Sequence, residues 1–263
     1  MSIGQPTFPL PMTPPPAPHI LLLECSGATA QCAVISAHNP IDNFSPPPTH
    51  PTLSLGPGKS EKILPLIEQA MTGFSYADLA AIAVTIGPGS FTGIRVGMSL
   101  AMGIAAAWDL PLFGINLFEV GKRQIRSSRI APPDQNFVVL VDSRRHSLYR
   151  QIYPADRVIL AECDETSYDD WSIGLSQGDW WVIGNGTHFI THEAANQAGI
   201  CARLVTPDVS PWQALAMCAR EKWFDYEQTG NVPNFAPLYI RPADVTLAKP
   251  ILAQPILAQP NQK

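Results

Sequence analysis

The sequence is poor in charge. Only 15% of its 263 residues are Asp, Glu, Lys or Arg, against roughly 25% in ordinary soluble domains. An unusually large share of the surface must therefore be uncharged or covered by a partner, which favours a subunit of an assembly over a free-standing monomer. The net charge of −5 excludes a protein-wide basic field that would draw the chain to phosphate backbones. We therefore expect a partner to hold any RNA.

Paired cysteines and long apolar runs are also missing. The five cysteines form no C-x-x-C pair, so the sequence predicts neither a disulfide framework nor a thiolate zinc site. No apolar run approaches the roughly 20 residues that a membrane-spanning helix needs, and the N-terminus lacks the charged-then-apolar order of a secretion signal. We expect a soluble protein in the reducing cytoplasm, without a membrane partner.

Proline marks both ends of the chain. Residues 1–18 contain seven prolines, and residues 250–263 repeat the pentapeptide Pro-Ile-Leu-Ala-Gln. Proline fixes φ and removes a backbone donor, so both segments are predicted to be flexible extensions.

Two lobes are predicted between these ends, over residues 19–119 and 120–249. Strands and helices alternate in the first lobe, which indicates an α/β fold. Its predicted elements are a hairpin of strands at 20–23 and 32–36, a helix capped by Ser60 over 60–71, a strand over 80–86, a helix over 91–107 and a strand over 112–115. The second lobe is predicted to hold strands over 137–143, 148–153 and 180–184 and a helix over 212–226.

A glycine-rich turn, GPGSFTG, joins the third strand and second helix of the first lobe. An anion can bind at such a place, because unpaired amides and the positive end of a helix converge there. The turn has neither the Walker A lysine nor the Rossmann spacing. Two interpretations stay open, a tight turn that needs glycine and a vestigial phosphate loop. The loop would comprise Gly87, Gly89, Ser90, Thr92 and Gly93.

No catalytic set stands out in the sequence. His188 and His192 have the i, i+4 spacing that can share a metal. However, no glutamate follows His188 to act as a base, and Gly186 indicates a loop, so no metal site is predicted. Glu24 on the first strand has no second acid beside it, and the nucleophile motif G-x-S-x-G is absent. A basic cluster is expected to be a solvated helix face; its members are Lys122, Arg123, Arg126 and Arg129.

Small residues dominate the helix predicted over 91–107. Glycine, serine and alanine allow another helix to approach closely, and methionine adapts to irregular contacts. Packing within the chain and pairing with a helix of another subunit are both compatible with this composition.

The segment AVTIGPGSFTGIRVG (83–97), followed by AMGIAAAWDLPLFGI (101–115), resembles the TsaB (YeaZ) family, paralogues of TsaD in tRNA threonylcarbamoyladenosine synthesis. Weaker matches follow the family's order at 60–67, 140–153, 182–186 and 237–246. The resemblance implies a two-lobed α/β fold of the actin-like, Hsp70-like and sugar-kinase (ASKHA, ribonuclease H-like) class. Lys59 and Glu24 stand where the family usually has His and Asp.

The resemblance also implies a function. The chain would be a non-catalytic subunit, without a cofactor of its own, that docks on a TsaD-type ATPase carrying ATP and metal. That complex would modify adenosine 37 of tRNAs reading codons that begin with A, would recruit a TsaE-type ATPase, and would hold tRNA mainly through the partner. A homodimer could use the same helices. The implied interface residues are Glu61, Leu64, Ile67, Met71, Arg95, Met98 and Met102.

The rival hypothesis is an enzyme of the same fold. A small ATP-dependent phosphotransferase predicts ATP binding by the isolated chain. A metallopeptidase predicts bound zinc that is lost when His188 is replaced.

Overall fold

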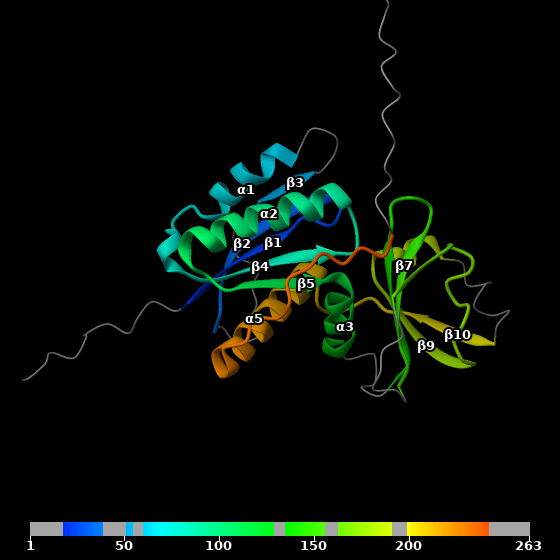
Figure 1. The fold of residues 1–263 in the computed structure, drawn as a ribbon. Helices are drawn as coiled ribbons and strands as arrows, with labels where there is room; N and C mark the ends of the chain where they lie inside the picture. Colours follow the sequence, from blue (N-terminus) through cyan, green and yellow to red (C-terminus); the bar gives the residue numbers. More distant parts are fainter. Residues whose placement is uncertain are drawn as a thin grey trace, which may run out of the picture.

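The computed structural model describes residues 18–38, 51–54, 60–128, 135–155, 163–190 and 199–241. Both proline-rich extensions fall largely or wholly outside these ranges, as do Lys59, Arg129 and His192. Figure 1 shows two lobes side by side, each built on a five-stranded sheet. The two-lobed α/β prediction is confirmed.

The sheet of the first lobe has the strand order β3-β2-β1-β4-β5. Its strands are β1 (His19–Glu24), β2 (Thr29–Ser36), β3 (Thr52–Ser54), β4 (Leu79–Gly87) and β5 (Leu112–Asn116). β2 is antiparallel to β1 and β3, whereas β1, β4 and β5 are parallel. The predicted hairpin is therefore confirmed. The central strands are almost wholly apolar, as expected for strands covered on both faces.

Two helices cover each face of this sheet (Figure 1). On one face α1 (Ile63–Ala70) and α2 (Phe91–Trp108) pack against β1, β2 and β4. On the other, α3 (Leu117–Ser127) and α5 (Pro211–Thr229) contribute Val120, Leu215 and Trp223 to a second core. The first lobe is thus a three-layer arrangement with its sheet in the middle.

The start of α1 differs from the prediction. Residues Ser60–Lys62 form a 3-10 turn, and Lys62 occupies the N-cap position without a side-chain cap, so Ser60 does not cap an α-helix. Pro65 explains the delay, because proline has no amide hydrogen and is tolerated only within the first helical turn. α2 starts as predicted, with the Ser90 hydroxyl accepting a hydrogen bond from Gly93 N at 3.2 Å.

The second sheet has the order β10-β9-β6-β7-β8. It comprises β6 (Phe137–Asp142), β7 (Leu148–Tyr153), β8 (Asp164–Thr166), β9 (Gly178–Ile183) and β10 (Ile200–Leu204). The three predicted strands are confirmed. β8 and β10 were not predicted, because β8 has only three residues and β10 buries little beyond its first residue.

α5 does not belong to the second lobe, contrary to the division at residue 120. Trp212 and Leu215 pack with Ile20 and Leu22 of the first sheet, and Arg220 Nε donates a 2.9 Å hydrogen bond to Ser36 O. The physical reason is that the second face of the first sheet must be buried, and α3, with eleven residues, is too short to cover that face alone.

α3 links the lobes, and its basic cluster is not a solvated face. Phe118 and Ile125 pack on the second sheet. Arg123 and Lys122 are half-buried, Arg123 pairing with Glu221 at 2.6 Å and Lys122 lying over the Tyr153 ring. Arg126 is exposed. Lys122 and Arg123 therefore serve the contacts of α3 with α5 and the second lobe.

The segment after α5, residues 231–241, runs back between the lobes and is called the strap below. Figure 1 shows it in orange and red, passing from α5 toward β7. Leu238 N donates to Ile86 O at 2.8 Å. Leu238 and Ile240 pack on the second-lobe core, and Phe235 packs on the first. The strap thus ties both sheets together at the end of β4.

Candidate docking helices and glycine turn

The glycine turn is shaped by its contact with the β1–β2 turn. Gly87 and Gly89 have φ of 109° and 154°, a region that L side chains disfavour. A Cβ at Gly89 would lie 2.3 Å from Ser26 O, and one at Gly93 would lie 2.1 Å from Cys25 O. Glycine is therefore required for the close approach of the two turns.

Several polar groups of the glycine turn are already bonded within the chain. Ser90 N donates to Ser26 O at 2.8 Å, and Gly93 N donates to the Ser90 hydroxyl. A Cβ at Gly87 would lie 2.8 Å from Leu238 O of the strap, so the turn is covered there. Thr92 stays exposed. These contacts favour the structural interpretation of the turn over a phosphate loop.

Glu24 organises the β1–β2 turn. Its Oε1 accepts hydrogen bonds from Ser26 N at 2.8 Å and Gly27 N at 3.2 Å, and also from the Ser26 hydroxyl. Burial raises the pKa of the Glu24 carboxyl, and these hydrogen bonds oppose that rise. Besides a side-chain hydrogen bond with Thr85 of β4, the bonding of this carboxylate is within its own turn, which is the arrangement of a turn-forming residue.

The described residues contain no group of three or more His, Cys, Asp or Glu side chains that could hold a metal ion. His188 lies in a 3-10 turn, η4 (Asn185–Phe189), that ends one residue later. Burial raises the pKa of the Cys25 and Cys32 thiols, which keeps them protonated and unreactive at neutral pH.

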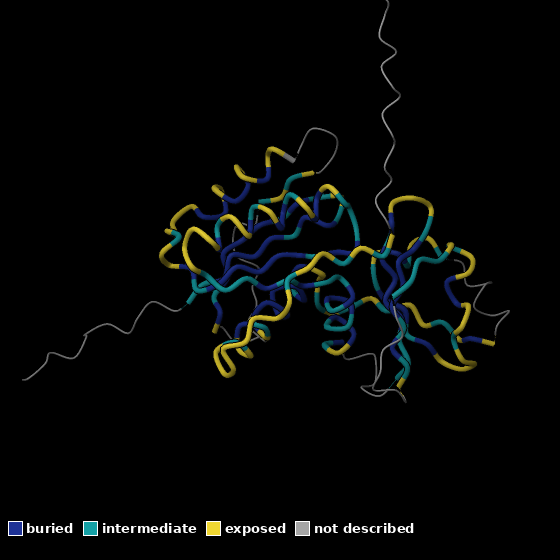
Figure 2. Tube along the Cα trace, in the orientation of Figure 1, coloured by how far each residue is buried: buried dark blue, intermediate teal, exposed yellow. Residues whose placement is uncertain are grey.

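α1 and α2 lie on the same face of the first sheet, and their outward residues include large apolar side chains. Leu64 is 43% exposed and Met102 is 52% exposed. Figure 2 shows the outward sides of both helices in yellow, above the dark blue strands. We name this surface the α1–α2 face; its exposed members are Glu61, Leu64, Arg95, Ser99, Met102, Gly103 and Ala106.

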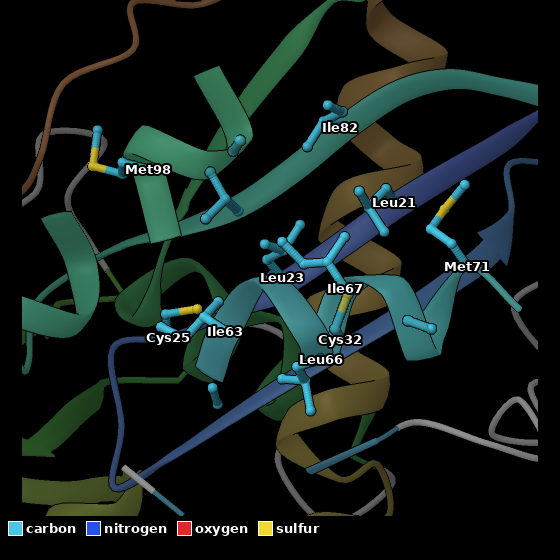
Figure 3. Close-up of a cluster of buried hydrophobic side chains, with 14 of the residues drawn as sticks. Leu21, Leu23, Cys25, Cys32, Ile63, Leu66, Ile67, Met71, Ile82 and Met98 are labelled. Carbon is cyan, nitrogen blue, oxygen red and sulfur yellow. The ribbon is translucent and has the colours of Figure 1, made fainter. Parts of the chain in front are cut away.

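Three of the expected interface residues are core residues instead. Ile67, Met71 and Met98 are buried in the same hydrophobic cluster as Leu21 and Leu23 of β1 (Figure 3). On α1 the buried positions are spaced by three and four residues, so Ile67 and Met71 lie on the stripe that faces the sheet. Of the expected set, Glu61, Leu64, Arg95 and Met102 remain on the surface.

Two glycines of α2 show which side of the helix the fold itself uses. A Cβ at Gly97 would lie 2.9 Å from the Cys25 Cβ, whereas a Cβ at Gly103 would meet no atom within 4 Å. Packing inside the chain therefore explains why a glycine is needed at position 97. It gives no reason for a glycine at position 103. Glycine costs about 1 kcal/mol relative to alanine inside a helix, so an outward glycine is consistent with close approach by another molecule.

α2 is long and apolar enough to cross a membrane, judged by length and composition alone: its mean hydropathy is 1.3 over 18 residues, 33% of which are buried. Its Ile94, Met98 and Ala101 pack on the first sheet, which is the environment of a core helix. Among the described residues, nothing covers Met102 and Gly103 on its other side.

Comparison with known proteins gives relatives of two kinds. The family model described as "TsaD: tRNA N6-adenosine threonylcarbamoyltransferase" matches residues 57–168. The tRNA threonylcarbamoyladenosine biosynthesis protein TsaB of Escherichia coli is 41% identical over 140 residues, which are 48% of this chain and 57% of that protein. A tRNA N6-adenosine threonylcarbamoyltransferase of Erythrobacter litoralis is 42% identical over 80 residues, 30% of this chain and 22% of that one.

The TsaB of Haemophilus influenzae is 34% identical over 93 residues, which cover 34% of this chain and 38% of that protein. The matched region therefore spans about half or less of the length of these curated relatives.

Solved structures extend the similarity to the whole fold. YeaZ from Pseudomonas aeruginosa superposes with a TM-score of 0.57 and 16% identity, over 84% of this chain and 99% of that one. A second structure from that organism, titled as similar to peptidase YEAZ, gives a TM-score of 0.59 and 15% identity, over 85% of this chain and 100% of that one. At this identity the agreement concerns the fold, and it confirms the predicted two-lobed α/β architecture. The sequence matches and this shared fold show that the chain is similar to the TsaB (YeaZ) proteins in its matched region and in its architecture.

Proposed function

We propose that this protein is a non-catalytic subunit of the complex that forms N6-threonylcarbamoyladenosine at position 37 of tRNAs reading codons that begin with A. Its task is to bind and stabilise a catalytic TsaD-type subunit through the α1–α2 face. The relatives named for TsaB and for the threonylcarbamoyltransferase support this pathway. ATP and metal belong to the partner, and a TsaE-type ATPase joins through the complex, which works in the cytoplasm.

The observation that carries the proposal is the apolar side of α2 that no described residue covers. Met102 is half exposed and Gly103 faces open space. Arg95 is the one charged residue of the helix. An apolar helix side with small residues lets the backbone of a second helix come close, and its burial contributes roughly 25 cal/mol per Å² of apolar area.

The non-catalytic role is supported by the chemistry around the glycine turn. Ser90 N and Gly93 N already have partners within the chain, and the Glu24 carboxylate bonds to its own turn. The metallopeptidase hypothesis has no specific observation in its favour, since His188 lies in a short turn.

Co-expression tests the proposal. The full chain should co-purify with a TsaD-type subunit as a complex of defined mass in analytical ultracentrifugation, and the complex should melt above either free subunit. The chain alone should not transfer threonylcarbamoyl to tRNA. Failure of the two subunits to associate at micromolar concentration, or transfer by the isolated chain, contradicts the proposal. In the absence of the partner we expect the same face to form a homodimer, which the partner displaces.

A further inference from the structure

A polar cleft of about 500 Å³ lies between the lobes, on a different part of the surface from the outward positions of α1. Its volume falls in the range of ligand sites, roughly 300–1,000 Å³. The glycine turn and the start of α2 (88–92) form one wall, the β6–β7 turn with Tyr149 forms another, and the end of the strap closes the third side. The side chains that matter below are Phe91, Arg144, Arg145, Tyr149, Tyr239 and Arg241.

The charge of this cleft is opposite to that of the molecule. Three arginines line it, namely Arg144, Arg145 and Arg241, and no carboxylate is among the lining residues, although the whole chain carries −5. Arg144 Nη1 donates to Gly27 O at 3.0 Å, and Arg241 lies 3.5 Å from Glu165. These arginines come from two separate elements, the β6–β7 turn and the strap, so the fold brings positively charged side chains from distant parts of the sequence to one cleft.

Aromatic rings stand beside the arginines. Phe91 and Tyr239 contact each other with ring centroids 4.9 Å apart, and Arg95 stacks on Phe91 at 3.7 Å and donates to the Tyr239 hydroxyl at 3.1 Å. Tyr239 is also 38% exposed. A partly exposed ring next to guanidinium groups is the usual platform for an unpaired base with its phosphates.

We propose that this cleft binds a single-stranded segment of RNA, with phosphodiester groups on Arg145 and Arg241 and a base on the Phe91–Tyr239 pair. The inference rests on the proposed function, because that function brings tRNA to the complex. A phosphodiester fits this cleft better than a nucleoside triphosphate does. A triphosphate is normally bound together with Mg²⁺, which carboxylates coordinate, and no carboxylate is among the residues that line the cleft. The cleft adjoins Arg95 on the α1–α2 face, so a strand in it would pass close to a docked partner.

Binding of a fluorescein-labelled, unstructured octaribonucleotide to the purified full chain tests this proposal by fluorescence anisotropy. The wild-type protein should bind it saturably at low salt. Arg145→Gln and Arg241→Gln should each weaken binding about tenfold, the effect of losing one hydrogen bond to a charged group. Each should also reduce the slope of log K against log salt by about 0.7. Tyr239→Leu should weaken binding without changing that slope.

Arg203→Gln is the matched control. Arg203 is an exposed arginine of β10 that pairs with Asp179 at 3.4 Å, outside the cleft, so its replacement should leave the affinity unchanged. Unchanged thermal unfolding of each variant establishes that it is folded. Retained association of Arg145→Gln with the TsaD-type subunit separates loss of RNA binding from loss of the proposed function.

Three results would overturn the proposal: no saturable binding of the oligonucleotide, equal affinity in the cleft and control variants, or competitive displacement of the oligonucleotide by AMP or ATP at lower concentration than by unlabelled RNA. The last result would identify a free-nucleotide site.

Discussion

α2 and α5 are helices of similar length on opposite faces of one sheet, and they meet their surroundings differently. α5 carries five charged residues; Glu221 and Lys222 form ion pairs with Arg123 and Glu119, and the Glu227 carboxylate lies 3.4 Å from His38 Nε2. α2 carries one charged residue, Arg95, and leaves Met102 and Gly103 uncovered. Many charged side chains of α5 thus have partners within the chain, although Phe224 of this helix is 60% exposed. The outward side of α2 combines exposed apolar and small residues with a single charge, which suits contact with a second molecule.

The inward side of α2 is the first place to test this contrast, because its residues are packed against the first sheet as those of α5 are. Gly93→Ala places a methyl carbon 2.1 Å from Cys25 O, which is far too close for two atoms that are not bonded. A backbone carbonyl in a tight turn cannot move aside, so we expect the free energy of unfolding to fall by about 3 kcal/mol, measured by urea denaturation. A loss below about 1 kcal/mol would show that the two turns are not rigidly packed.

The outward side of α2 should respond in binding and not in folding. Met102→Asp buries a carboxylate in the proposed interface, and we expect the Kd for the TsaD-type subunit to rise by roughly 30-fold or more, about 2 kcal/mol. Isothermal titration measures it.

Phe224→Asp is the control for that experiment, since Phe224 is 60% exposed on α5. It should leave the Kd unchanged. Equal losses from both substitutions would remove the distinction between the two helices.

Gly103→Ala separates folding from association within one residue. Helix propensity should raise the free energy of unfolding by about 0.5–1 kcal/mol, because the new methyl group meets nothing. The same methyl group should weaken partner binding by holding the second helix away. Thermal unfolding measures the change in stability, and isothermal titration measures the change in affinity for the partner. A variant that gains stability and keeps full affinity would show that the partner does not contact Gly103.

The smallest effect is expected on α5. Glu221→Gln removes the partner of Arg123, but the Glu221 side chain is 48% exposed. Such pairs contribute about 0–1 kcal/mol, so the free energy of unfolding should fall by less than about 1 kcal/mol. A larger loss would mean that α5 depends on its ion pairs and not on the packing of Trp212 and Leu215.

Local sequence signals predicted most helices and strands, but not which residues of each helix face the sheet and which face outward. The alternation of β-branched runs with turns located β1, β2, β4 and β6, and Ser90 before an apolar run located the start of α2. Periodicity shows that a helix has an apolar side, yet the neighbouring structure decides which residues fall on it. Ile67, Met71 and Met98 were therefore assigned to the interface, although the sheet covers them.

Long-range packing also escaped the sequence. α5 joins the first lobe across a separation of 184 residues between Ser36 and Arg220, and no local pattern encodes such a contact. The arginine-lined cleft is a similar case. Arg145 and Arg241 lie almost one hundred positions apart and the strap has no helix or strand of its own, so neither periodicity nor a motif indicated that these side chains would meet.

The return of α5 to the first sheet has a consequence for how the protein is made. A nascent chain that has reached the end of α3 already contains all five strands of that sheet, yet Ile20, Leu22 and Phe113 have no α5 to cover them. At about 5–20 residues per second, the ribosome needs several more seconds to deliver α5. During that time an apolar sheet face stays open to other nascent chains, so chaperone capacity during synthesis should set the yield of soluble protein.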